Sequence, residues 1–162
     1  MKRIHLFPLV LILIACSAGI MAAERAPDVS FATLEEGHRA SLEDFRGQVV
    51  VLNLWAVWCS PCIIEIPHLV RLQPELEAVG ATVIGLAVDS GSAEAIRRFW
   101  NNRLEIEPVY PLWKTTVAEA GELFDARTYP TTLIIDREGR IRESLLGLQT
   151  REDLLAAVQP YL

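Results

Sequence analysis

The sequence predicts a single α/β domain in which a mixed β-sheet carries helices on both faces. Two nearly continuous apolar runs, QVVVLNLW at residues 48–55 and ATVIGLAV at residues 81–88, are typical of strands that are covered on both faces. A helical pattern lies between them and makes a β-α-β unit, which a hairpin precedes and a β-β-α series follows. A chain of 162 residues has room for one such domain.

The composition is that of a folded globular chain, with 51% hydrophobic and 22% charged residues. The formal net charge is -6. Lys2 and Arg3 lie in a segment that looks like a targeting sequence, and leaving out these two positive charges lowers the total to -8. Because phosphate binding needs a basic face, we expect no nucleic acid among the partners.

The first 23 residues are interpreted as an export signal or a membrane anchor, because two positive residues precede a long apolar run. Three interpretations are open. The stretch LIAC at residues 13–16 resembles a bacterial lipoprotein signal, which is cut before a cysteine that receives the lipid, so Cys16 is a candidate for lipidation. Residues 4–23 are also long enough for an uncleaved anchoring helix of about 30 Å.

In the third interpretation, a cut after Ala23 releases a soluble domain, although Met21 at the -3 position makes this a poor site. All three place residues 25–162 outside the cytoplasm, and the first two keep them attached to the membrane. Disulfides persist in such a compartment.

The first half of the domain begins with an extended lead-in at residues 24–30 and a short hairpin at residues 30–42, with Glu36-Gly37 at its turn. A strand at residues 48–55 and a helix follow. Apolar residues three or four apart give that helix one buried stripe, at Ile66, Leu69, Leu72, Leu76 and Val79. Pro67 removes a backbone donor inside the helix and is expected to kink it, and Pro74 is a second candidate for a kink.

The second half begins with the strand at residues 81–88. Ser92 is expected to cap a helix with an apolar face formed by Ile96, Phe99, Trp100 and Leu104. Residues 105–128 are predicted to hold a short strand at Val109–Leu112 and a short helix at Val117–Phe124.

The C-terminal part is predicted to be a β-β-α series. TTLIID at residues 131–136 is strand-like, and REGR is typical of a hairpin turn into a strand at Ile141–Leu146. Thr150 then caps a last helix, whose inward-facing residues are Leu154, Leu155 and Val158.

Cys59 and Cys62 are spaced Cys-x-x-Cys, a pattern found in metal sites, in structural disulfides and in reactive dithiols. A closed zinc site needs four ligands, and the sequence has no second Cys-x-x-Cys and only three dispersed histidines, so we expect no metal. A purely structural disulfide would close a very short loop and would restrict the unfolded chain little.

A reactive dithiol fits the position best, because Cys59 falls where a strand ends and a helix begins. The unpaired N–H groups and the dipole of a helix N-terminus favour a thiolate there, so the pKa of this thiol should fall. Pro61 in the first turn costs no hydrogen bond. We expect Cys59 at the exposed helix end to be the nucleophile and Cys62, one turn further, to attack the mixed disulfide that Cys59 forms.

The motif NLWAVWCSPCIIEIP resembles the TlpA/ResA branch of thiol-disulfide oxidoreductases in the thioredoxin superfamily, whose pattern is about N-x-W-A-x-W-C-x-P-C-x-x-E-x-P. The stretch APDVSFATLEEGHRASLEDFRGQVVVLNLWA resembles the N-terminal hairpin and first core strand of that family, and YPTTLIIDREGRI resembles its cis-proline strand. The resemblance covers about residues 26–160. It implies a thioredoxin-like domain at residues 26–162. The match is weakest between residues 90 and 128, where this family carries an insert.

The resemblance also implies roles for particular residues. Cys59 would be the attacking thiol and Cys62 the buried resolving thiol of a redox-active disulfide. Pro130 would be a cis-proline, and the backbone at Tyr129 would offer hydrogen bonds to a bound peptide. Trp58, beside the nucleophile, is expected both to pack and to shield it.

Glu65 is a candidate for proton transfer at Cys62, from which it lies three residues away, one helical turn on. Thioredoxin has a buried aspartate at the position of Asn53, and asparagine cannot accept that proton. The alternative is an ordinary surface glutamate, although the apolar run IIEIP around Glu65 favours a functional role.

The resemblance implies an extracytoplasmic enzyme that needs no cofactor and reduces disulfides in exported client proteins, for example in cytochrome c maturation. Such a protein would be recharged by a membrane electron donor of the DsbD or CcdA type. Two other functions are alternatives: a peroxidase of the peroxiredoxin kind, or a copper chaperone of the Sco type. The peroxidase chemistry centres on a different cysteine motif, and the chaperone needs Cys-x-x-x-Cys and a distant histidine.

Overall fold

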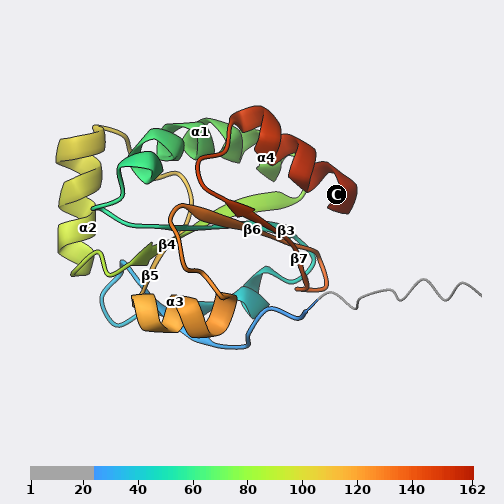
Figure 1. Cartoon of the computed structure of the whole chain (residues 1–162), viewed down its shortest axis with the longest axis horizontal. Coiled ribbons are helices and arrows are strands. Elements are labelled where there is room, and N and C mark those ends of the chain that lie inside the picture. The colour runs from blue at the N-terminus through green and yellow to red at the C-terminus, as the bar shows by residue number, and fades with distance from the viewer. Residues whose placement is uncertain (1–23) are drawn as a thin grey trace, which may run out of the picture.

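The computed structural model describes residues 24–162, so the predicted signal or anchor, including Cys16, lies outside the described residues. One seven-stranded mixed sheet has the order β2-β1-β5-β4-β3-β6-β7, with helices on both of its faces (Figure 1). The predicted fold class is therefore confirmed. The elements are β1 (Ser30–Thr33), β2 (Arg39–Ser41), the 3₁₀ helix η1 (Leu42–Phe45), β3 (Val49–Trp55), α1 (Ser60–Glu77), β4 (Ala81–Val88), α2 (Ala93–Phe99), the π-helix η2 (Trp100–Leu104), β5 (Leu112–Thr115), α3 (Val117–Phe124), β6 (Thr131–Ile135), β7 (Ile141–Leu146), α4 (Arg151–Val158) and the 3₁₀ helix η3 (Gln159–Tyr161).

The centre of the sheet is the parallel pair β3 and β4, in which every residue is buried. Side chains of β3 alternate between two hydrophobic clusters, as the two-residue period of a strand requires. Val49 and Val51 pack with α1 and α4, whereas Val50 and Leu52 pack with the α3 side. Figure 1 shows α1 and α4 on one face and α3 on the other. This double coverage explains why the two central strands are continuous apolar runs.

The hairpin and the buried stripe of α1 follow the prediction except at one residue. β1 and β2 pair antiparallel around the turn at Glu36-Gly37. The helix continues through both of its prolines, and its buried residues include Ile66, Leu69, Leu72 and Leu76. Placing Val79 on this stripe was wrong, because α1 ends at Glu77 and Val79 is 46% exposed. Gly80, with a positive φ of 77°, then leads the chain into β4.

The strand predicted at Val109–Leu112 is wrong in position, because β5 runs from Leu112 to Thr115. It pairs in parallel with β4 and antiparallel with β1. Pro111 has no N–H to give to a ladder, and its carbonyl instead accepts a hydrogen bond from the Gly85 amide at 2.9 Å. Regular pairing therefore starts only after this proline.

The remaining elements lie where the sequence places them, except that the helix predicted to include Leu104 is α-helical only to Phe99 and continues as the π-helix η2. The Ser92 hydroxyl caps α2, and the Thr150 hydroxyl caps α4. The helix α3 has the predicted bounds, and β6 and β7 form the predicted hairpin, with Asp136 in its turn rather than in the strand. No helix among residues 24–162 combines the length and the apolar character needed to cross a bilayer.

Candidate active site

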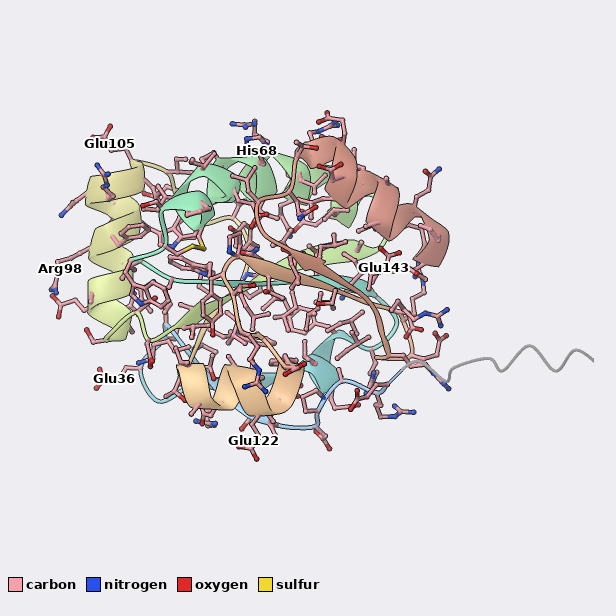
Figure 2. The ribbon with its side chains drawn as sticks, viewed as in Figure 1. Glu36, His68, Arg98, Glu105, Glu122 and Glu143 are labelled. Atoms are coloured by element: carbon pink, nitrogen blue, oxygen red, sulfur yellow. A yellow bond between two sulfur atoms is a disulfide. The ribbon has the colours of Figure 1, made fainter. Side chains whose placement is uncertain are left out.

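Cys59 and Cys62 lie where the central strand β3 gives way to α1, and they are joined by a disulfide (Figure 2). Cys59 is the N-cap residue of α1, and its sulfur accepts a hydrogen bond from the Cys62 amide at 3.3 Å. One of the unpaired donors of the helix start is thus directed at this sulfur. The same donor would stabilise a Cys59 thiolate after reduction, which is the physical basis for a reactive first cysteine.

The expectation that Cys59 lies exposed at the helix end is wrong, since the residue is only 5% exposed. Cys62 is fully buried, and both cysteines belong to the hydrophobic cluster that Trp55 and Ile66 also line. The disulfide holds the Cys59 sulfur against this core. The order of accessibility nevertheless agrees with an attacking first and a resolving second cysteine.

Trp58, Tyr129 and Pro130 lie together beside the cysteine motif. The Tyr129–Pro130 peptide bond is cis. The Trp58 ring meets the Tyr129 ring edge-on at a centroid distance of 5.7 Å. Trp58 is 56% exposed, so its ring lies at the surface, next in sequence to the disulfide-bonded Cys59. The structure thus brings together the three residues that were predicted to contact a substrate.

The loop after β4 fixes the segment that precedes Cys59. The Ser90 hydroxyl accepts a hydrogen bond from the Val57 amide at 3.1 Å, and the Asp89 carbonyl accepts one from the Trp58 indole at 3.3 Å. Sequence reasoning missed both residues of this loop. A signal was available for Ser90, because a small polar residue directly after a buried strand often bonds to neighbouring backbone.

Glu65 is fully buried, so the surface alternative for this residue is excluded. Its two carboxylate oxygens accept hydrogen bonds from different elements. The Asn53 side-chain amide of β3 donates to Oε2 at 2.7 Å, and the Gln149 main-chain amide donates to Oε1 at 2.8 Å. The Asn53 amide also donates to the Thr132 hydroxyl of β6 at 2.9 Å. This network connects the helix of the cysteines with the strand that follows Pro130.

Burial raises the pKa of Glu65 above its ordinary value, and the hydrogen bonds from Gln149 and Asn53 counteract this in part. A carboxyl group with a raised pKa accepts a proton from a thiol more readily than an exposed glutamate does. Glu65 can therefore serve as the base for Cys62, one helical turn away.

Thr132 and Gln149 are members of the Glu65 network that sequence reasoning missed. Asn53 in an otherwise apolar buried strand was the available signal, because a buried amide requires hydrogen-bond partners. That signal does not name the partners. Gln149 contributes its main-chain amide, which every residue except proline has.

Comparisons with known proteins agree with this geometry. The chain is 31% identical to the thioredoxin-like protein YneN of Bacillus subtilis over 84% of this chain and 78% of the relative. It is 29% identical to the thiol-disulfide oxidoreductase ResA of Bacillus thuringiensis over 94% of both. A solved structure of a secreted thiol-disulfide isomerase from Corynebacterium glutamicum matches with a TM-score of 0.73 and 30% identity over 84% of each chain.

The site has a disulfide at the N-terminus of the helix that follows a central strand, with a cis-proline beside it, and this arrangement defines a thioredoxin-like protein. Because its relatives are thiol-disulfide oxidoreductases and isomerases, the protein is a thiol-disulfide oxidoreductase. Residues 22–144 match the model of the AhpC/TSA family, and the chain belongs to this family.

Proposed function

We propose that this protein is an extracytoplasmic reductase that donates electrons to oxidised cysteines of exported client proteins. The observation that carries the direction is the charge pattern of α1, in which the charged residue nearest to the dithiol along the helix is the buried acid Glu65. The location is supported by the apolar N-terminal run after Lys2 and Arg3 and by the secreted relative of Corynebacterium glutamicum. Apocytochromes c whose cysteines have become oxidised are one client class that the family resemblance suggests.

The reaction starts from a reduced enzyme with Cys59 as thiolate and Cys62 as thiol. Cys59 attacks one sulfur of the client disulfide, so an enzyme–client S–S bond forms and the first client thiolate leaves. Glu65 takes the proton of Cys62, and the resulting thiolate attacks the Cys59 sulfur. The enzyme disulfide forms, the second client thiolate leaves, and two electrons have passed to the client.

The reductive direction follows from weak stabilisation of the thiolate. A strong oxidant such as DsbA, at about -120 mV, has a greatly stabilised acidic thiol, whereas thioredoxin lies at about -270 mV. Ser60 and Pro61, between the cysteines, bring no cation to the site. A charged Glu65 opposes thiolate formation, and only the helix N-terminus favours it. The potential should therefore lie nearer to that of thioredoxin.

Such a reductase must be recharged in an oxidising compartment. We therefore include a membrane electron donor of the DsbD or CcdA type as the partner that reduces the Cys59–Cys62 disulfide. The client and this donor would approach the same surface beside Trp58, since both exchange electrons with the same sulfur.

Equilibration with glutathione buffers, followed by tryptophan fluorescence, should give a reduction potential of about -270 mV. The double variant Cys59→Ser/Cys62→Ser is the control and should show no transition. A potential near that of DsbA would make the protein an oxidant and reject the proposal. Mixing the reduced protein with a peroxide and with copper(I) tests the peroxidase and chaperone alternatives.

Membrane attachment is predicted to use a lipid on Cys16, which lies outside the described residues. Metabolic labelling with palmitate should tag the wild type and leave Cys16→Ser unlabelled. If neither protein carries label but both fractionate with membranes, the uncleaved helix is the anchor. If both are soluble, both anchoring interpretations are wrong.

A further inference from the structure

Gln149 lies in the loop between β7 and α4 and makes three hydrogen bonds. Its main-chain amide donates to Glu65 Oε1 at 2.8 Å. Its side-chain amide donates to the carbonyl oxygens of Leu146 and Gly147, at 3.2 and 2.9 Å. One residue therefore holds both the buried carboxylate and the loop that leads away from β7.

This loop reaches the candidate active site. The Gly147 amide donates to the carbonyl oxygen of Pro130 at 2.9 Å. Leu146 and Leu148, on either side of this glycine, are 67% and 41% exposed. The last residue of β7 and the loop after it thus present two apolar side chains next to the segment of the cis-proline, where an extended client segment would lie.

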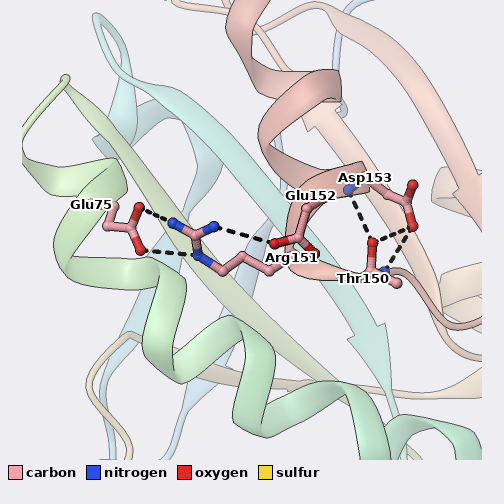
Figure 3. A network of polar contacts seen from close by, with 5 residues as sticks. All are labelled: Glu75, Thr150, Arg151, Glu152 and Asp153. Atoms are coloured by element: carbon pink, nitrogen blue, oxygen red, sulfur yellow. Dashed lines mark hydrogen bonds and ion pairs between the residues drawn. The ribbon is translucent and has the colours of Figure 1, made fainter.

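The C-terminal end of the loop, at Thr150 and the start of α4, is held by contacts that do not involve Glu65. The Thr150 hydroxyl accepts from the Asp153 amide, and the Asp153 carboxylate accepts from the Thr150 amide and hydroxyl (Figure 3). Arg151 binds the Glu75 carboxylate of α1, and it also contacts Glu152. Because these contacts hold the start of α4, weakening the bond between Gln149 and Glu65 would loosen the loop and leave the helix in place.

We propose that Gln149 is a positioning residue that couples the charge of Glu65 to the Leu146–Leu148 loop beside Pro130. A carboxylate accepts a hydrogen bond roughly twice as strongly as a neutral group does. When Glu65 gains the Cys62 proton, the Gln149 bond weakens and the apolar loop loosens, which would favour release of a client whose residues next to the cysteine are apolar. The inference rests on the proposed function in that Glu65 gains its proton during client reduction.

In the oxidised protein, Glu65 is the group at this site whose charge we expect to change with pH. Asn53, Thr132 and Gln149 carry no charge, and Cys59 and Cys62 do not titrate as a disulfide. Tyr110, from the segment before β5, stays neutral, because burial raises the pKa of its hydroxyl well above the ordinary range and the negative charge of Glu65 raises it further. Arg151 of α4 pairs with Glu75 and Glu152.

The test is a pH titration of the oxidised full chain by ¹H–¹⁵N NMR, without client or reductant. In the wild type, the amide signals of Gln149 and Gly147 should shift with one common midpoint, and in Glu65→Gln both shifts should be lost. Gln149→Ala keeps the main-chain donor and lacks the side-chain bonds. Its residue-149 amide should still follow Glu65, whereas its Gly147 amide should not. Gln48→Ala, at an exposed position before β3, is the matched control and should behave as the wild type.

A wild-type Gly147 amide that does not follow Glu65 would overturn the inference, and so would a Gly147 amide that still follows it in Gln149→Ala. If Gln149→Ala fails to fold, hydrogen exchange of the loop amides decides between the same outcomes. Their protection should fall at low pH in the wild type and should show no such fall in Glu65→Gln. A DsbA-like potential would reject the proposed function alone, since this coupling is measured in the oxidised protein.

Discussion

Cys62→Ser is expected to lose turnover of disulfide substrates down to the uncatalysed background and to accumulate a mixed disulfide through Cys59. Cys62 is fully buried and bonded to Cys59, so it is the residue placed to resolve such an intermediate. A serine oxygen cannot complete the second exchange, and the client therefore remains attached. Non-reducing electrophoresis followed by mass spectrometry of the adducts measures the trapped species and identifies the clients.

Cys59→Ser is the matched control, because it removes the sulfur at the helix start and leaves Cys62 in the core. We expect neither turnover nor an adduct from it. An adduct that forms on Cys62 in this variant, and none on Cys59 in Cys62→Ser, would reverse the assignment of nucleophile and resolving cysteine.

The central elements could be predicted from the sequence because their local pattern and their tertiary environment agree. β3 and β4 are apolar throughout and are covered on both faces, and the stripe from Ile66 to Leu76 faces one of the two hydrophobic clusters. The N-caps of α2 and α4, Ser92 and Thr150, could also be predicted from the sequence, since a single hydroxyl satisfies a backbone N–H donor at the start of a helix.

The errors occur where a distant partner decides the local structure. Val109 and Tyr110 look strand-like, yet β5 begins at Leu112, where pairing with β4 starts. Val79 keeps the helical spacing of the apolar stripe, but the chain has already left α1 to enter β4. A periodic pattern carries no information about where a neighbouring strand ends the element.

In the candidate site, too, some residues could be predicted from the sequence and others could not. The motif NLWAVWCSPCIIEIP pointed to Cys59 and Cys62, and the stretch YPTTLIIDREGRI pointed to Pro130, because both stretches resemble one family. The burial of Glu65 was indicated by the apolar run around it, but its partner Gln149 was not, since a main-chain donor leaves no trace in the sequence. Only the return of the chain after β7 brings Gln149 to α1.

Glu65→Gln is expected to remove a pH-dependent part of the stability and to slow the resolving step by about 10²-fold. Burial raises the pKa of Glu65 in the folded protein above its ordinary value of 4.5. The protonated form therefore contributes stability that is fully present below the pKa of the unfolded chain and is lost as the pH rises through the folded pKa. Each unit of this difference corresponds to about 1.4 kcal/mol.

Urea unfolding of the oxidised proteins at a series of pH values measures this contribution. The free energy of unfolding of the wild type should fall relative to that of Glu65→Gln between pH 4.5 and the raised pKa, and the difference should then stay level. Glu122→Gln, at an exposed position of α3 (Figure 2), is the matched control and should keep the wild-type profile. Parallel stability curves for the wild type and Glu65→Gln would mean that Glu65 has the same pKa in the folded and unfolded chain. An unchanged pH profile of disulfide reduction would in turn exclude Glu65 as the base for Cys62.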